Sequence, residues 1–274
     1  MSEILRNWEN GLGFPGVLVI DGHAHIGAWR HAATYHSVEQ AAEDTLRFLD
    51  SNGVDAACSM SGGYMFEGTD YRLGNDFLLE VCKRIPDRLI GFAHVNPNDG
   101  RDAILAELDR VYDRGVRCLK LINAYQQQYP GDGPNLMAVY EYAASHGMLN
   151  LNHHWALEVL TQISAEFPEV DFICGHYSEG YDPVLKARDN VYANTWNYGA
   201  YGWLDRGLAD VGAGKFVFGS DAFLNPMSVG LGPVVYAAVS DGEKRLVLGI
   251  TMARLLDKVG ALPPWIREQY LAGA

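Results

Sequence analysis

The chain lacks the features of a membrane or secreted protein. None of its apolar runs approaches the roughly 20 residues that a helix needs to cross a bilayer. Its first ten residues show no basic stretch followed by an apolar one, as a secretory signal would. It has only four cysteines in 274 residues, and no two of them form a Cys-x-x-Cys pair. Such sparse thiols predict buried, reduced cysteines, so we expect a cytoplasmic protein.

Positive charge and glycine-rich phosphate loops are also scarce. The 21 Lys and Arg residues face 34 Asp and Glu residues, which gives a formal net charge of −13 without a basic cluster. Nucleic acids and anionic membranes bind mainly through Lys and Arg, so we expect neither as a partner and expect a small-molecule substrate instead. No Gly-x-Gly-x-x-Gly follows the first strand signal, which argues against a dinucleotide-binding fold. Association into a homo-oligomer stays open.

The chain does contain a regular alternation of strand and helix signals. Apolar runs bounded by glycine, proline or polar residues indicate eight strands, at 17–20, 54–60, 89–95, 116–122, 148–152, 170–174, 191–196 and 216–218. Helical patterns lie between or after them, at 38–49, 75–85, 102–114, 136–146, 157–167, 229–239, 243–248 and 251–259. No hairpin-type turn joins consecutive strands.

This alternation predicts an α/β protein whose parallel strands are joined by helical crossovers. Eight such units is the number that closes a (β/α)₈ TIM barrel, and such barrels commonly run to about 250 residues as one unit. We therefore expect a single domain over residues 1–274. A doubly wound open sheet is the alternative, and the missing phosphate-binding loop argues against it.

The first strand signal runs into Asp-Gly-His-Ala-His, which places His23 and His25 two positions apart. Side chains alternate along a strand, so both imidazoles are expected on the same side of its carboxyl end. There they can close on a single cation, since imidazole suits Zn, Fe, Mn or Ni. The alternative is that they are ordinary polar residues at a strand end, and for an isolated His-x-His that alternative is favoured.

Other strand signals also end in polar residues. His153 follows the fifth strand, His176 the sixth and Asp221 the eighth. In a barrel the carboxyl ends of the strands form the rim of the active site. Each residue alone could be a helix cap or part of a turn. The convergence of five on one rim favours a shared metal site, with three or four ligands and one position open to water.

The motif set resembles a known family. Asp-Gly-His-Ala-His on strand one, a histidine after strand five, Gly-His after strand six and Phe-Gly-Ser-Asp on strand eight are similar to the amidohydrolase superfamily. More narrowly, they resemble its amidohydrolase-related group of metal-dependent TIM-barrel hydrolases and non-oxidative decarboxylases, typified by aminocarboxymuconate-semialdehyde decarboxylase. Pro-Asp-Arg-Leu-Ile-Gly-Phe-Ala at 86–93 and Ala-Arg-Leu-Leu at 253–256 agree with this, so the resemblance covers nearly the whole chain.

The resemblance implies one divalent metal ion, most often zinc and alternatively manganese, held by His23, His25, His153 and Asp221. His176 is expected beside the metal-activated water as its acid or base, or as a further ligand. Asp221 is expected to accept the proton of that water in addition to binding the metal.

Two further residues compete for roles in this site. His154 competes with His153 as a ligand, and the alternation that begins at Leu149 and Leu151 favours His153. Lys120 lies on the fourth strand, where two-metal members of the superfamily carry a carboxylated lysine. Because the group usually has one metal, we expect Lys120 to be a structural or substrate-binding residue.

The resemblance and the site together predict a metal-dependent hydrolase that cleaves an amide, ester or lactone bond of a small organic molecule through a metal-activated water. The alternative within the family is a metal-dependent, non-oxidative decarboxylase of an unsaturated or aromatic acid, which the similarity of His-His-Trp at 153–155 to the decarboxylases' His-Pro-Trp supports. The alternative from another class is a catalytically inactive barrel with a binding or scaffold role. The complete ligand set argues against it.

Residues in the loops after strand ends are the candidates for substrate binding. We single out Arg30, Trp155 and Tyr177, with Arg30 as the cation for a carboxylate. The aromatic residues suggest a partly apolar or planar substrate. The further aromatic candidates are Trp29, Tyr64, Tyr125, Trp196 and Tyr198.

Overall fold

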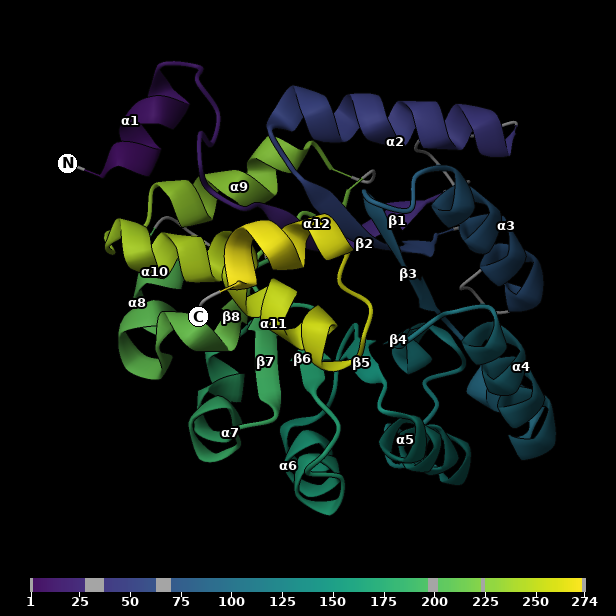
Figure 1. The fold of residues 1–274 in the computed structure, drawn as a ribbon. Helices are drawn as coiled ribbons and strands as arrows, with labels where there is room; N and C mark the ends of the chain where they lie inside the picture. The colour runs from purple at the N-terminus through teal and green to yellow at the C-terminus, as the bar shows by residue number, and fades with distance from the viewer. Residues whose placement is uncertain (1, 28–36, 63–69, 197–201, 223–224, 273–274) are drawn as a thin grey trace.

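The computed structural model describes residues 2–27, 37–62, 70–196, 202–222 and 225–272. Eight parallel strands lie side by side in the order of the chain (Figure 1). They are β1 (Ile20–Ile26), β2 (Ala56–Ser61), β3 (Leu89–Ala93), β4 (Cys118–Leu121), β5 (Leu149–Asn152), β6 (Phe172–Cys174), β7 (Val191–Asn194) and β8 (Phe216–Val217). This arrangement confirms the predicted α/β class and the (β/α)₈ TIM barrel.

The barrel closes where β8 meets β1. The backbone N–H of Gly22 donates to the carbonyl of Phe218 at 2.8 Å, and the N–H of Asp221 donates to the carbonyl of His23 at 2.8 Å. These bonds connect the last strand to the first, so the sheet has little free edge. They also bring the segment after β8 directly against the two histidines of β1.

The helices form an outer layer around the strands (Figure 1). They are α1 (Glu3–Glu9), α2 (Val38–Asn52), α3 (Tyr71–Arg84), α4 (Arg101–Asp113), α5 (Pro134–His146), α6 (Leu157–Glu166), α7 (Asp182–Ala187), α8 (Trp203–Val211), α9 (Met227–Val235), α10 (Asp241–Arg245), α11 (Thr251–Lys258) and α12 (Pro264–Ile266). Within the described ranges, no helix combines the length and the apolar character needed to cross a membrane.

Local sequence signals explain the ends of some of the helices. Ser37 caps the start of α2 by accepting from the N–H of Gln40, and Gly53 ends it in the left-handed conformation. The predicted helix at 75–85 instead starts at Tyr71, because the side chain of Asp70 caps that earlier position.

The barrel interior is filled with apolar side chains from alternate strand positions. Cys58, Phe92 and Leu151 belong to one buried cluster, and Leu256 of α11 belongs to it together with Leu18, which precedes β1. The helices after β8 therefore close the amino end of the barrel, and the carboxyl end remains for the site. All four cysteines are free, as the sequence predicts.

Candidate metal centre

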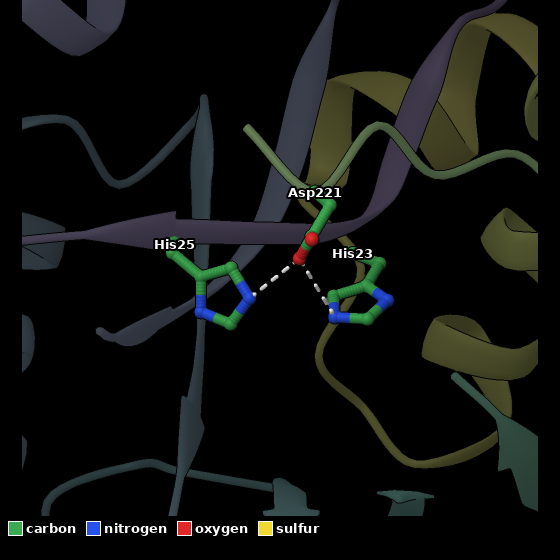
Figure 2. A group of neighbouring side chains, drawn as sticks. All are labelled: His23, His25 and Asp221. Atoms are coloured by element: carbon green, nitrogen blue, oxygen red, sulfur yellow. Dashed lines mark hydrogen bonds and ion pairs between the residues drawn. The ribbon is translucent and has the colours of Figure 1, made fainter. Parts of the chain in front are cut away.

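His23, His25 and Asp221 meet where β1 lies against the segment after β8. Figure 2 shows the two imidazole rings on either side of the Asp221 carboxylate. The Nε2 atom of His25 lies 2.9 Å from Oδ1 of Asp221, and Nε2 of His23 lies 3.5 Å from the same oxygen. All three residues are buried, and one ligand atom of each lies within 4.8 Å of the others. Two imidazole nitrogens and one carboxylate oxygen suit Zn²⁺ or Mn²⁺.

A β-bulge in β1 aims the two histidines. Asp21 pairs with Ala57 of β2 and Ala24 with Ser59, so β1 carries one residue more than β2 over this stretch. Bulges of this kind redirect side chains and are frequent next to active sites. His23 lies within this stretch and His25 just beyond it, and both side chains face Asp221.

Asp221 reaches the site from a strained backbone. Its φ of +55° lies in the left-handed region, which is uncommon for residues other than glycine, although Asp and Asn tolerate it. Strained conformations of this kind cluster at functional sites, where the surrounding structure holds them in place.

The side chain of Asp21 holds this backbone in place. It is fully buried and accepts hydrogen bonds from the hydroxyl of Ser220, from the N–H of Ser220 at 3.1 Å and from the N–H of His23 at 3.0 Å. Burial raises the pKa of Asp21 to about 7, although these bonds oppose the shift. The sequence motifs alone do not predict a supporting role for Asp21 or Ser220, although both residues lie inside them.

We expect Ser220→Ala to lower the free energy of unfolding by about 1–3 kcal/mol, because it leaves the buried Asp21 carboxyl without its hydroxyl donor. Urea unfolding at neutral pH measures the change. Ser51→Ala, at an exposed position of α2, is the matched control. Equal urea midpoints for the two variants would show that the Asp21–Ser220 hydrogen bond does not stabilise the contact between β1 and the segment after β8.

His23 is oriented by a backbone carbonyl. Its Nδ1 atom lies 3.0 Å from the carbonyl oxygen of Gly175, which can only accept, so Nδ1 carries the proton and Nε2 has a free lone pair. Burial and then the charge of Lys120 lower the pKa of His23 well below its usual range, so the ring is neutral. Metal-binding histidines are commonly held in this way. The Nζ atom of Lys120 lies 2.8 Å from the same Nε2.

The Asp221 carboxyl is ionised at neutral pH. Burial alone would raise its pKa, but the hydrogen bond with His25 and the electrostatic effects of the neighbouring His25, His23 and Lys120 hold that pKa well below its usual range. A carboxylate that stays ionised beside two imidazoles provides the negative charge that a divalent cation requires.

His153 and His176 form a separate pair. His176 Nε2 lies 2.9 Å from His153 Nδ1, and His153 Nε2 lies 3.0 Å from the hydroxyl of Tyr125. The His176 ring lies 5.4 Å from the His23 ring, measured between centroids. Burial, followed by the charge of Lys120, lowers the pKa of His176 to about 4 and that of His153 to about 2. Three of the four expected ligands thus lie together, and the role of His153 as the fourth stays a prediction.

His154 points away from this pair. Its side chain is exposed, and Nδ1 lies 2.8 Å from the hydroxyl of Tyr181. The structure therefore places His153 next to His176, and it places His154 against the loop before α7.

These positions lead to opposite expectations for two alanine variants. His154→Ala should bind Mn²⁺ as the unmodified protein does. His153→Ala should weaken binding by about 10- to 100-fold, the scale for losing a group around metal ligands. Isothermal titration with Mn²⁺ measures both. Complete loss of binding in His153→Ala would assign it as the fourth ligand, whereas loss in His154→Ala would contradict the placement of both residues.

The predicted substrate-binding aromatic residues lie elsewhere. Trp155 is 1% exposed and donates through Nε1–H to the Tyr140 hydroxyl on α5, and Tyr177 is fully buried and donates to Asp182 on α7. Both side chains therefore pack against the outer helices, which does not fit the expected contact with substrate. Of the described aromatic candidates, only Tyr125 is exposed, at 50%, and Trp196 is buried. The other candidates lie outside the described residues: Trp29, Arg30, Tyr64 and Tyr198.

Comparisons with known proteins agree with this geometry. Residues 20–258 match the sequence model of a family described as amidohydrolase. No curated protein matches the chain.

Several solved structures share the fold. A 5-carboxyvanillate decarboxylase from Sphingomonas paucimobilis has a TM-score of 0.70 at 16% identity, over 88% of this chain and 99% of that one. A dihydroxybenzoic acid decarboxylase from a Polaromonas species, with bound manganese and the inhibitor 2-nitroresorcinol, has a TM-score of 0.73 at 13% identity, over 90% and 99%. A 4-oxalomesaconate hydratase from Rhodopseudomonas palustris has a TM-score of 0.66 at 15% identity, over 93% and 100%.

Proposed function

The chain belongs to the amidohydrolase family, and we propose that it is a metal-dependent lyase that releases CO₂ from a small aromatic or unsaturated carboxylic acid. The structural neighbours support this choice over hydrolysis, because two of those described are decarboxylases of aromatic acids and the third is a hydratase. The hydrolase that the sequence analysis favoured is thereby the second candidate.

His23, His25 and Asp221 are the residues that would hold the metal. Their nitrogen and oxygen donors, their burial and the fixed tautomer of His23 fit a divalent cation. Manganese in one of the neighbours supports Mn²⁺ as well as Zn²⁺. When bound, such an ion supplies Lewis-acid polarisation of substrate oxygen atoms.

The hydrogen-bonded pair of His153 and His176 is the observation that carries the proposal. Non-oxidative decarboxylation breaks a C–C bond, releases CO₂ and leaves the electron pair on carbon, which must then take a proton. His176 lies beside His23 and is joined through His153 to the hydroxyl of the half-exposed Tyr125. The lowered pKa values of the two imidazoles make their protonated forms strong acids. A ring that is protonated at one nitrogen and releases a proton from the other therefore supports proton delivery to carbon at the site.

Hydrolysis makes a different demand on the same residues. It requires a base for water, and the ionised Asp221 is suited to that task. The two candidate reactions therefore differ in the residue that moves the proton and in the fate of solvent atoms.

Isotope labelling separates the two candidates. Protein loaded with Mn²⁺ or Zn²⁺ is incubated with a panel of hydroxylated benzoic acids, unsaturated dicarboxylic acids, lactones, esters and anilides. We expect CO₂ from an acid of the panel and, in D₂O, deuterium at the carbon that lost the carboxylate. Cleavage of an ester, lactone or amide with ¹⁸O incorporated from labelled water would favour the hydrolase instead. Activity that is unchanged after removal of all metal would contradict both candidates.

A further inference from the structure

Lys120 is the buried amine of this site, and neither proposed reaction uses it. Burial lowers its pKa to about 7. The residue lies on β4, is 2% exposed and pairs in register with Leu151 of β5. Its Nζ atom lies 2.8 Å from His23 Nε2. Burying an ammonium group without a function is costly, so its position next to a candidate metal ligand requires an explanation.

Only one nitrogen of the His23 ring can bind a metal ion. Nδ1 is committed to the Gly175 carbonyl, so the ring can bind a cation only through Nε2. In the structure Nε2 accepts an N–H from Lys120. A lone pair that accepts an N–H is not available to a metal ion, so Lys120 and the ion compete for a single atom.

The positive charge of a protonated Lys120 also opposes metal binding. Lys120 acts electrostatically on Asp221, the carboxylate that a divalent ion would also use. Two cations drawn to the same nitrogen and the same carboxylate repel each other strongly in a buried site. A protonated Lys120 therefore opposes the binding of a divalent ion at these atoms.

The walls around the Lys120 amine are closely packed. A Cβ atom at position 175 would stand 3.2 Å from Nζ and 2.8 Å from the Asn152 carbonyl, so glycine is needed at that wall. On the other side, Cys58, Phe92 and Leu151 lie next to both Lys120 and His23. This packing holds Nζ against His23 Nε2.

We propose that Lys120 competes with a divalent ion for His23 Nε2, through the N–H that it donates to this atom, and thereby makes metal binding weak and reversible. This inference rests on the proposed metal role of His23, His25 and Asp221. It predicts that the metal-binding strength of the site is set by a residue that does not itself bind metal.

The test is Lys120→Met, which keeps an unbranched side chain but removes the charge and the N–H donors. We expect Mn²⁺ and Zn²⁺ to bind this variant more tightly than the unmodified protein by about 10- to 100-fold, the scale on which groups around the ligands change metal affinity. Competition with a chelator measures the dissociation constants, and mass spectrometry under native conditions counts the ions per chain. Lys186→Met, at an exposed position of α7, is the control.

The outcomes separate this inference from the proposed function. Unchanged or weaker affinity in Lys120→Met, or a lower ion count, would overturn the inference, and a mass increase of one CO₂ on Lys120 would identify it as a carboxylated ligand. Tight binding by both proteins would overturn the inference and leave the proposed function intact. Absence of binding in both would overturn both. If Lys120→Met does not give the circular dichroism spectrum of the folded protein, Lys120→Gln replaces it in the same measurements.

Discussion

Asp221→Asn is expected to lower kcat by about 10²- to 10⁴-fold, because it removes the carboxylate that would hold the metal ion and, in hydrolysis, the base for water. The change keeps the size of the side chain, and asparagine tolerates the left-handed backbone at this position, so the fold should persist. It removes the negative charge that contacts His25 and His23. Steady-state kinetics on the best acid of the substrate panel measures the loss, and metal titration measures how much metal is retained.

The matched control is Asp113→Asn, which neutralises an exposed aspartate at the end of α4. It should leave kcat and metal content unchanged. If Asp221→Asn keeps more than about a tenth of the activity, less than 1.4 kcal/mol of transition-state stabilisation has been lost. The Asp221 carboxylate would then be neither the charge that holds the ion nor a group that moves a proton.

The barrel could be predicted from the sequence because its signals repeat. Each of the eight strands carries an apolar run, and neighbouring parallel strands leave few alternative arrangements. Short outer helices were harder. The sequence pattern does not predict α8, because Gly207 interrupts the helical pattern. A Cβ at this position would collide with the hydroxyl of Tyr177, so packing selects glycine against helix propensity.

The candidate site likewise contains residues that the sequence predicts and features that it does not. His23, His25 and Asp221 could be predicted to meet because strand ends of a barrel converge. The alternation of side chains agrees with the different partners of His153 and His154, which are His176 and Tyr181, while the role of His153 as a ligand stays a prediction. The alternation of side chains along a strand does not predict where a side chain packs once the strand has ended. Trp155 shows this, because its large apolar surface is buried against α5 and not at the barrel mouth. The bulge in β1 likewise depends on the register of its pairing with β2, so the sequence of β1 alone does not predict it.

His176→Asn is expected to lower kcat by about 10²- to 10⁴-fold while leaving metal content nearly unchanged. His176 bonds to His153 and lies beside His23, but it is not part of the group formed by His23, His25 and Asp221. Asparagine still offers a hydrogen-bonding group to His153 but cannot accept and release a proton near neutral pH. The measurements are metal content by elemental analysis and kinetics on the same substrate as for Asp221→Asn.

The ratio of the kinetic constants makes this prediction specific to proton transfer. A group that acts mainly in the transition state lowers kcat and kcat/KM alike, whereas a group that only binds substrate raises KM. His154→Asn is the control, since that exposed side chain contacts Tyr181 and should affect neither constant. If His176→Asn instead loses its metal, His176 is a ligand and the site resembles a two-metal arrangement. Lys120, 2.8 Å from His23, would then be the next ligand to test.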